Sequence, residues 1–204
     1  MIQIIEFCAV ISAALFGILL ARSKGMDFIG VCSLAFIVAF GGGTLRDVLL
    51  DRQPLFWIEH DHYAWIVFAI AIIGSILPRL PARFENWLDI PDALGLAFFS
   101  VVGAGVAIDV TTFNVSPFLA TLFGVITGTF GGVIGDIASN EIPRLFRPAT
   151  RLYASCSFIG CWVYLLLRDT ALSEPIALWT GVTVIVLMRL AALRWNLRLP
   201  ASPA

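Results

Sequence analysis

The chain has 204 residues, of which 59% are hydrophobic and only 13% are charged, and its formal net charge is −1. A soluble globular domain carries about 25% charged residues, so the composition excludes a water-soluble fold with an ordinary polar surface. The net charge says nothing about nucleic acid, but the sequence has no basic block and no aromatic RNA-binding motif, so no nucleic-acid partner is expected. The mean hydropathy of +0.93 indicates an all-α membrane protein that crosses the bilayer several times.

Seven apolar segments follow one another along the chain, joined by short connections. No basic residue precedes the first, so we interpret it as a retained span and not as a signal peptide. We therefore expect an all-α polytopic membrane protein with one domain, residues 1–204. Its seven transmembrane helices are predicted at 2–21, 28–50, 62–80, 92–110, 115–139, 152–167 and 175–193.

The basic residues of the short loops predict the orientation in the membrane. Only Arg52 and Arg168 lie on one side. Nine lie in the loops after the odd-numbered segments: Arg22, Lys24, Arg79, Arg83, Arg144, Arg147, Arg151, Arg194 and Arg198. We therefore expect the N-terminus outside and the C-terminus in the cytoplasm.

A sequence motif occurs twice. Residues 40–56 read FGGGTLRDVLLDRQPLF, and residues 130–145 read FGGVIGDIASNEIPRL. A constant offset of 89 residues aligns Asp47 with Asp136 and Pro54 with Pro143. The motif residues of interest are Gly41, Gly42, Gly43, Arg46 and Asp47 in the first copy, and Gly131, Gly132, Gly135 and Asp136 in the second.

The two copies lie in two units of three spans, about 2–80 and about 91–167, with an extra helix at about 175–193. Since each unit holds an odd number of spans, the second must be inverted relative to the first. Two inverted repeats with interrupted helices that meet near the bilayer midplane are typical of many transporters and some channels.

The glycines admit two interpretations. Glycine costs about 1 kcal/mol in a helix relative to alanine, so three in succession favour a kink or an unwound turn. Small residues at a four-residue spacing, as at Gly124, Gly128 and Gly132, also let two membrane helices pack closely. For the consecutive triplet we favour the kink, because only one face of a helix can contact a given neighbour.

Charges inside a membrane face a protein interior or an aqueous path. Asp47 and Asp136 each lie one turn after a glycine, and we expect both to approach one central cavity from opposite sides. Arg46 has no counterpart, since position 135 is glycine. It is either a gate or clamp on this path or a structural ion pair near a helix end.

Other polar residues give weaker signals. We interpret Glu6 as interfacial, Asp92 as a helix cap and Arg189 as a side chain that extends to the cytoplasmic surface. His60 and His62 in one loop make a poor metal site, so no metal and no cofactor are expected. No nucleophile–base pair or phosphate loop is present, and we expect no enzymatic activity.

With the segments FGGGTLRDVLL and FGGVIGDIASNEIP in the second and fifth spans, the chain resembles the bacterial trimeric intracellular cation (TRIC) channel family, also described as glycine-transporter-like. The resemblance covers residues 6 to about 194. It implies a homotrimer in the bacterial inner membrane, with one pore in each subunit lined by spans two and five. The expected partners are further copies of the chain, membrane lipids and permeant monovalent cations, chiefly potassium.

Three functions remain open at this point. The first is a passive channel in which glycine-kinked helices and the two aspartates replace water around potassium. The second is a secondary transporter for glycine or a similar zwitterion, with Arg46 holding the carboxylate. The third is a structural membrane protein without transport activity.

Overall fold

The structure is a computed structural model, and it describes residues 2–77, 88–110, 114–147, 151–170 and 172–198. The predicted end of the third span at 80 and the loop residues Arg79 and Arg83 lie outside these ranges. The described part of the chain is helical throughout, apart from its turns, loops and one isolated bridge between Arg151 and Arg198. The all-helical fold predicted from composition is confirmed.

Each of the seven apolar segments forms a helix that begins within three residues of the predicted position. The helices are α1 (Ile2–Ser23), α2 (Phe28–Leu49), α4 (His62–Ile76), α5 (Asp89–Asp109), α6 (Pro117–Ala138), α7 (Ala154–Arg168) and α8 (Glu174–Trp195). The loops after α2 and α6 hold two short elements, α3 (Phe56–Glu59) and the 3-10 helix η2 (Arg144–Phe146).

In the described part of the chain, five helices are long and apolar enough to cross a membrane: α1, α2, α5, α6 and α8. The described parts of α4 and α7 have 15 residues each, or about 22 Å of helix, whereas the hydrocarbon core is about 30 Å thick. The chain is a multi-pass membrane protein. That α4 and α7 also span the bilayer stays a prediction.

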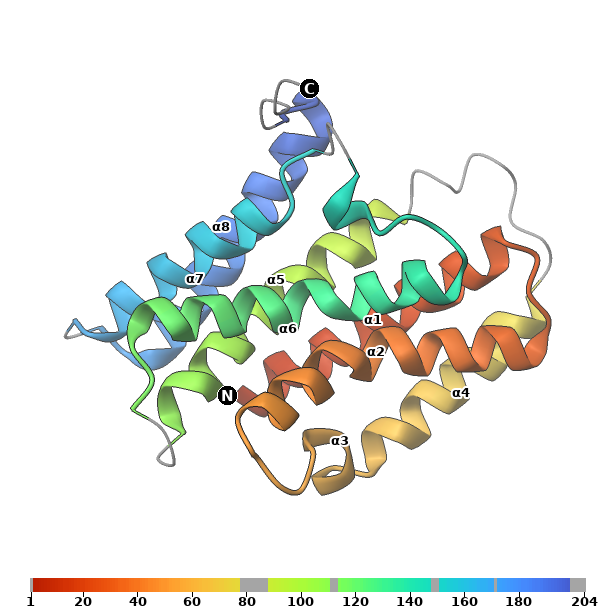
Figure 1. The fold of residues 1–204 in the computed structure, drawn as a ribbon, viewed down its shortest axis with the longest axis horizontal. Coiled ribbons are helices and arrows are strands. Elements are labelled where there is room, and N and C mark those ends of the chain that lie inside the picture. The colour runs from red at the N-terminus through yellow and green to blue at the C-terminus, as the bar shows by residue number, and fades with distance from the viewer. Residues whose placement is uncertain (1, 78–87, 111–113, 148–150, 171, 199–204) are drawn as a thin grey trace.

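The helices form two groups of three with α8 added at one end (Figure 1). In the first group α1, α2 and α4 pack together, and in the second α5, α6 and α7 do so. The groups meet along two contacts, α1 with α5 and α2 with α6, while α8 packs on α7 and α5. The α2–α6 contact therefore lies at the boundary between the two groups.

Local sequence determines where α2 and α6 begin. Asp27 caps α2, because its carboxylate accepts a hydrogen bond of 2.8 Å from the backbone N–H of Gly30. Ser116 caps α6 in the same way, because its hydroxyl accepts a hydrogen bond from the N–H of Leu119. Pro117 follows in the first turn, where the absence of a backbone N–H costs no helix hydrogen bond. From these starts the two helices run side by side in opposite directions (Figure 1).

The ends of α2 and α6 have the same geometry. Asp51 and Asn140 take left-handed backbone angles, with φ of 50° and 56°. The following N–H groups then reach back: that of Arg52 bonds the carbonyl of Asp47 at 2.8 Å, and that of Glu141 bonds the carbonyl of Asp136 at 2.9 Å. These are Schellman motifs, which satisfy carbonyls left free at a helix end. The 89-residue offset of the sequence is therefore also an offset between equivalent backbone turns.

Candidate functional site

The backbones of α2 and α6 touch at their glycines. A Cβ placed on Gly42 would lie 2.1 Å from the carbonyl oxygen of Thr127, and one on Gly131 would lie 2.4 Å from the carbonyl oxygen of Val38. Neither distance is compatible with a side chain, and the obstacle in both cases is rigid backbone. Gly42 and Gly131 thus let two antiparallel helices approach more closely than any other residue would allow.

The remaining glycines of the triplet face other neighbours. A Cβ on Gly41 would lie 3.1 Å from the Ile134 side chain of α6, and one on Gly43 would lie 2.3 Å from the ring of Phe56 in α3. Successive helix positions point about 100° apart, so Gly41 and Gly42 meet different residues of α6, and Gly43 meets α3. The α-helix continues through all three positions, so the triplet forms no unwound turn, and each of its glycines is closely packed. That α2 is kinked here stays a prediction.

In the second motif, Gly132 and Gly135 differ in how tightly they are packed. A Cβ on Gly135 would lie 2.6 Å from the Val38 side chain, whereas one on Gly132 would meet only the Tyr153 hydroxyl, at 3.4 Å. The helix α6 is likewise continuous through these positions. Gly132 is therefore the one glycine of this motif at which a methyl group fits.

Asp47 is fully buried in the last turn of α2. Its carboxylate accepts hydrogen bonds of 2.8 Å from Nε of Arg46 and 2.8 Å from the backbone N–H of Phe56, and Arg52 approaches to 3.4 Å. A carboxylate is unfavourable at the negative end of a helix, so these donors are needed to hold it there. Asp47 therefore fixes the loop after α2.

Asp136 has the equivalent role at the end of α6. Its carboxylate accepts a hydrogen bond of 2.9 Å from the backbone N–H of Arg144 and one of 3.4 Å from the Arg144 guanidinium. Although burial opposes the charge of Arg144, the carboxylates of Asp92 and Asp136 raise its pKa above the usual arginine value. Arg144 thus stays positively charged beside Asp136.

The two aspartates lie at opposite ends of the α2–α6 contact, because the helices are antiparallel and each aspartate is in the last turn of its own helix (Figure 1). Their polar partners come from their own halves of the chain. The expectation that both approach one central cavity does not describe this structure. Each instead belongs to a separate buried charge cluster.

The first cluster contains a second acid, Glu6 of α1, which is only 6% exposed. Arg46 and Arg52 are close enough for their charges to act on Glu6, and Tyr63 of α4 lies near it, with its hydroxyl donating a 3.4 Å hydrogen bond to the carbonyl of Gln3. Glu6 is thus buried within the protein near the start of α1, and its interfacial depth in the membrane stays a prediction. This cluster, defined by Glu6, Arg46, Asp47, Arg52 and Tyr63, is called the first cluster below.

The second cluster, defined by Asp92, Asp136, Arg144, Tyr153 and Arg189, has the same composition of two acids, two arginines and one tyrosine. The Tyr153 hydroxyl donates a 2.9 Å hydrogen bond to Asp92, and Arg189 of α8 lies 3.4 Å from the same carboxylate. Asp92 is therefore not a helix cap; α5 begins before it, at Asp89. Arg189 is 3% exposed and does not extend to the surface as expected.

Sequence reasoning missed the tyrosines and Arg189, although one signal was present. Tyr63 and Tyr153 are 90 residues apart, close to the motif offset, and both lie at or next to the start of the third helix of their group. Arg189 gave no such signal, because α8 has no counterpart in the repeat. Arg189 supplies the second arginine of this cluster, because the position of the second motif that corresponds to Arg46 is Gly135.

A small cavity of about 20 Å³ lies between the two helix groups. It is bounded on one side by Gly128, Gly131 and Gly132 of α6 and on the other by Asp92 and Tyr153. Neither Asp47 nor Asp136 lines it. Since one water molecule needs about 10–15 Å³ of such space, this cavity holds roughly one water.

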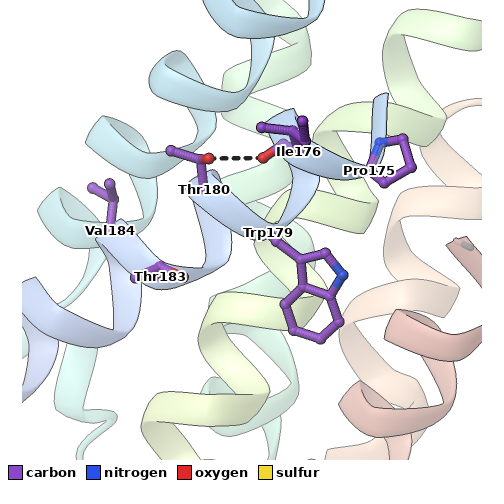
Figure 2. Close-up of a pocket in the computed structure, with 6 residues that line it drawn as sticks. All are labelled: Pro175, Ile176, Trp179, Thr180, Thr183 and Val184. Atoms are coloured by element: carbon purple, nitrogen blue, oxygen red, sulfur yellow. Dashed lines mark hydrogen bonds between the residues drawn. The ribbon is translucent and has the colours of Figure 1, made fainter. Parts of the chain in front are cut away.

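Two larger hollows lie on the surface. One, of about 280 Å³, is lined by His60, His62 and Tyr63 with residues of α1. Within the described ranges no group of three or more metal-ligating side chains occurs there or elsewhere. The other, of about 410 Å³, is an open apolar groove along α8 (Figure 2). Its one drawn hydrogen bond joins the Thr180 hydroxyl to the carbonyl of Ile176 within the same helix.

These features define a class of protein: a helical membrane protein with two charge clusters at the ends of a glycine-mediated helix contact. Comparison with known proteins identifies its family. The family model described as "Glycine transporter" matches residues 3–79 and 89–169. The chain belongs to this family, which is the TRIC family.

Curated relatives match nearly the whole chain. A UPF0126 membrane protein of Vibrio cholerae is 38% identical over 188 residues, covering 92% of this chain and 77% of the relative. The UPF0126 inner membrane protein YadS of Escherichia coli is 38% identical over 190 residues, covering 92% of this chain and 89% of YadS.

Solved structures of TRIC channels share the fold. The TRIC orthologue from Rhodobacter sphaeroides, described as a trimeric intracellular cation channel, superposes with a TM-score of 0.88 at 30% identity, covering 96% of this chain and 98% of that one. A second structure, from work on conductance through TRIC cation channels, gives a TM-score of 0.86 at 30% identity over 99% of this chain and 97% of that one. TRIC channels are neither enzymes nor cofactor-dependent.

Proposed function

We propose that this chain forms a homotrimeric channel for monovalent cations, permeable to potassium, with one pore in each subunit along the α2–α6 contact. The observation that carries the proposal is the full-length similarity to solved TRIC cation channels at 30% identity. The residues assigned to the pathway are Gly41, Gly42, Gly43, Arg46 and Asp47 on α2 and Gly131, Gly132, Gly135 and Asp136 on α6.

The buried charges support a pathway. A single charge at the centre of a membrane helix costs about 2.5–3.5 kcal/mol on insertion scales, and such residues usually serve transport. Here four acids and four arginines lie in two clusters, one at each end of the glycine contact. Because the cavity between the helix groups holds roughly one water, the path in this conformation is too narrow for a hydrated cation and is closed.

The matched halves support an inverted repeat of 2–80 and 91–167, with α8 as the extra helix. The family model covers two segments of similar length, 3–79 and 89–169. The helix ends at Asp47 and Asp136 also share their hydrogen bonds and left-handed turns. We further propose the bacterial inner membrane as the location, as for the relative YadS, with the N-terminus outside and the C-terminus in the cytoplasm.

A flux assay tests the proposal. Purified protein in liposomes with an outward potassium gradient should take up rubidium, a potassium analogue, and uptake should be insensitive to added glycine. Protein-free liposomes and liposomes with an unrelated helical membrane protein serve as controls. Folded protein that gives no uptake above these controls would contradict the proposal.

One observation favours transport of glycine as a second candidate function. Arg46 is fully buried, and among the described residues its Nη1 has no hydrogen-bond partner. A free guanidinium nitrogen suits the carboxylate of a zwitterion. This function predicts saturable uptake of labelled glycine that Arg46→Met abolishes. A protein with neither rubidium nor glycine uptake would have a structural role.

A further inference from the structure

Of the four acids in the two clusters, Asp92 is the one that lines the small cavity between the helix groups, and the repeated motif does not contain it. Asp92 is 5% exposed and shares this cavity with Gly128, Gly131 and Gly132. The cavity is also lined by Val38 of α2, which touches Gly131 of α6. A cation that passes this point comes closer to Asp92 than to either motif aspartate, since neither of those lines the cavity.

Arg189 binds Asp92 from outside the repeat. Its guanidinium lies 3.4 Å from the Asp92 carboxylate, bonds the carbonyl of Leu152 at 3.1 Å and lies 4.7 Å from the centre of the Tyr153 ring. In the described part of the chain, Nε of Arg189 is buried without a hydrogen-bond partner. A charged group held in this way is only partly satisfied where it lies.

The other charges around Asp92 come from the loop after α6. Arg144 lies 3.9 Å from Asp92 and 3.4 Å from Asp136, so its charge is shared between two acids. Asp136 is also held by a backbone N–H. Among the described residues, Asp92 is the one acid that pairs with Arg189, whereas Arg144 pairs with two. The two acids are therefore balanced by two arginines as long as Arg189 is present.

We infer that Asp92 is the cation-binding carboxylate of the path and that Arg189 is a tethered cation that occupies this site when the path is closed. A permeating monovalent cation competes with the guanidinium for the Asp92 oxygens. The inference rests on the proposed channel function and deepens it, because it gives α8 a part in conduction. It also predicts that conduction saturates with potassium at a concentration set by Arg189.

The test is single-channel conductance as a function of potassium concentration, in the wild type and three variants. Arg189→Gln removes the competing charge. Asp92→Asn with Arg189→Gln removes both charges, so the local balance is kept and the two amides can still bond. The control is Arg168→Gln, which removes a partly exposed arginine that ends α7 and pairs with Asp109.

In Arg189→Gln the half-saturating potassium concentration should fall by about tenfold, because partners of a buried charge pair are commonly coupled by at least that factor. The double variant should lose saturation and select less strongly for potassium over chloride. Arg168→Gln should match the wild type. If Arg189→Gln does not fold, the double variant carries the test alone.

Two results would overturn the inference in different ways. Currents in both Arg189 variants that saturate as in the wild type would refute the roles of Asp92 and Arg189 and leave the channel function intact. A folded wild-type protein without any current would remove the channel function and this inference together.

Discussion

At the residue scale, the sequence indicated two of the four cluster acids, Asp47 and Asp136, but not the groups that bind them. Asp47 and Asp136 were recognisable because each follows glycines in an apolar run. Their partners were not, because the N–H groups of Phe56 and Arg144 reach them only after the chain has turned back on itself. Contacts made by such turns depend on backbone angles that no residue spacing specifies.

The glycine contact gives a prediction with a built-in control. Gly42→Ala should destabilise the protein by about 1–3 kcal/mol, because its methyl group would overlap the Thr127 carbonyl and force the backbones apart. Gly132→Ala should be nearly neutral, since its methyl group meets only the Tyr153 hydroxyl at 3.4 Å. Thermal unfolding of both variants in detergent measures the difference. Equal melting temperatures would show that the α2–α6 contact is looser than described.

Asp47 gives a second prediction. Asp47→Asn should cost about 3–5 kcal/mol, because it leaves the fully buried Arg46 without its carboxylate. Arg46→Met together with Asp47→Asn should recover most of this loss, since a buried ion pair can be replaced by neutral groups. Unfolding of the single and double variants tests this. A double variant no more stable than Asp47→Asn would mean that Asp47 acts mainly through the loop and not through Arg46.

At the element scale, the helices themselves were predictable and their ends less so. Apolar runs, together with Asp27 and Ser116 as caps, set the starts of α2 and α6. The seven segments accordingly match seven helices. No comparable sequence signal marks α3 and η2, which are too short for a periodic pattern. No unwound turn occurs at Gly41, Gly42 and Gly43, because close packing on α6 and α3 compensates for the low helix propensity of glycine.

One contact between loops predicts a pH dependence. Lys24, after α1, pairs with Glu141, after α6, and its hydrogen bond and charge lower the pKa of the Glu141 carboxyl. Because this pKa is lower in the folded than in the unfolded protein, the ion pair stabilises the fold at pH values above the ordinary pKa of glutamate. This stabilisation is lost as the pH falls through the folded-state pKa. The protection of the backbone amides in the loop after α1, measured as hydrogen exchange corrected for the intrinsic rate at each pH, should therefore fall in acid. Glu141→Gln should show this low protection already at neutral pH; wild-type protection in the variant would contradict the pairing.

At the scale of the whole molecule, the two halves are alike in their helix ends and charge clusters and differ in α8. The first cluster draws its arginines from the motif itself, while the second takes Arg189 from α8. Comparing the sequences of the two halves shows their similarity. It cannot show that Arg189 takes the place of a motif arginine in the second cluster, since α8 has no counterpart in the first half. The asymmetry supports different roles for the two ends of the path.

The proposed assembly gives a further prediction. In mild detergent the protein should have a mass close to three times 22.2 kDa once bound detergent is subtracted. Light scattering coupled to size exclusion measures it. A monomer that still conducts in bilayers would contradict the trimer while leaving one pore per subunit in place.

The most direct test of the central claim is the reversal potential of single channels in a planar bilayer with unequal potassium chloride on the two sides. The channel proposal predicts unitary current steps that reverse near the potassium equilibrium potential and are unchanged by glycine. Folded protein that gives no unitary steps, yet takes up labelled glycine in liposomes from the same preparation, would contradict the proposal and establish a transporter.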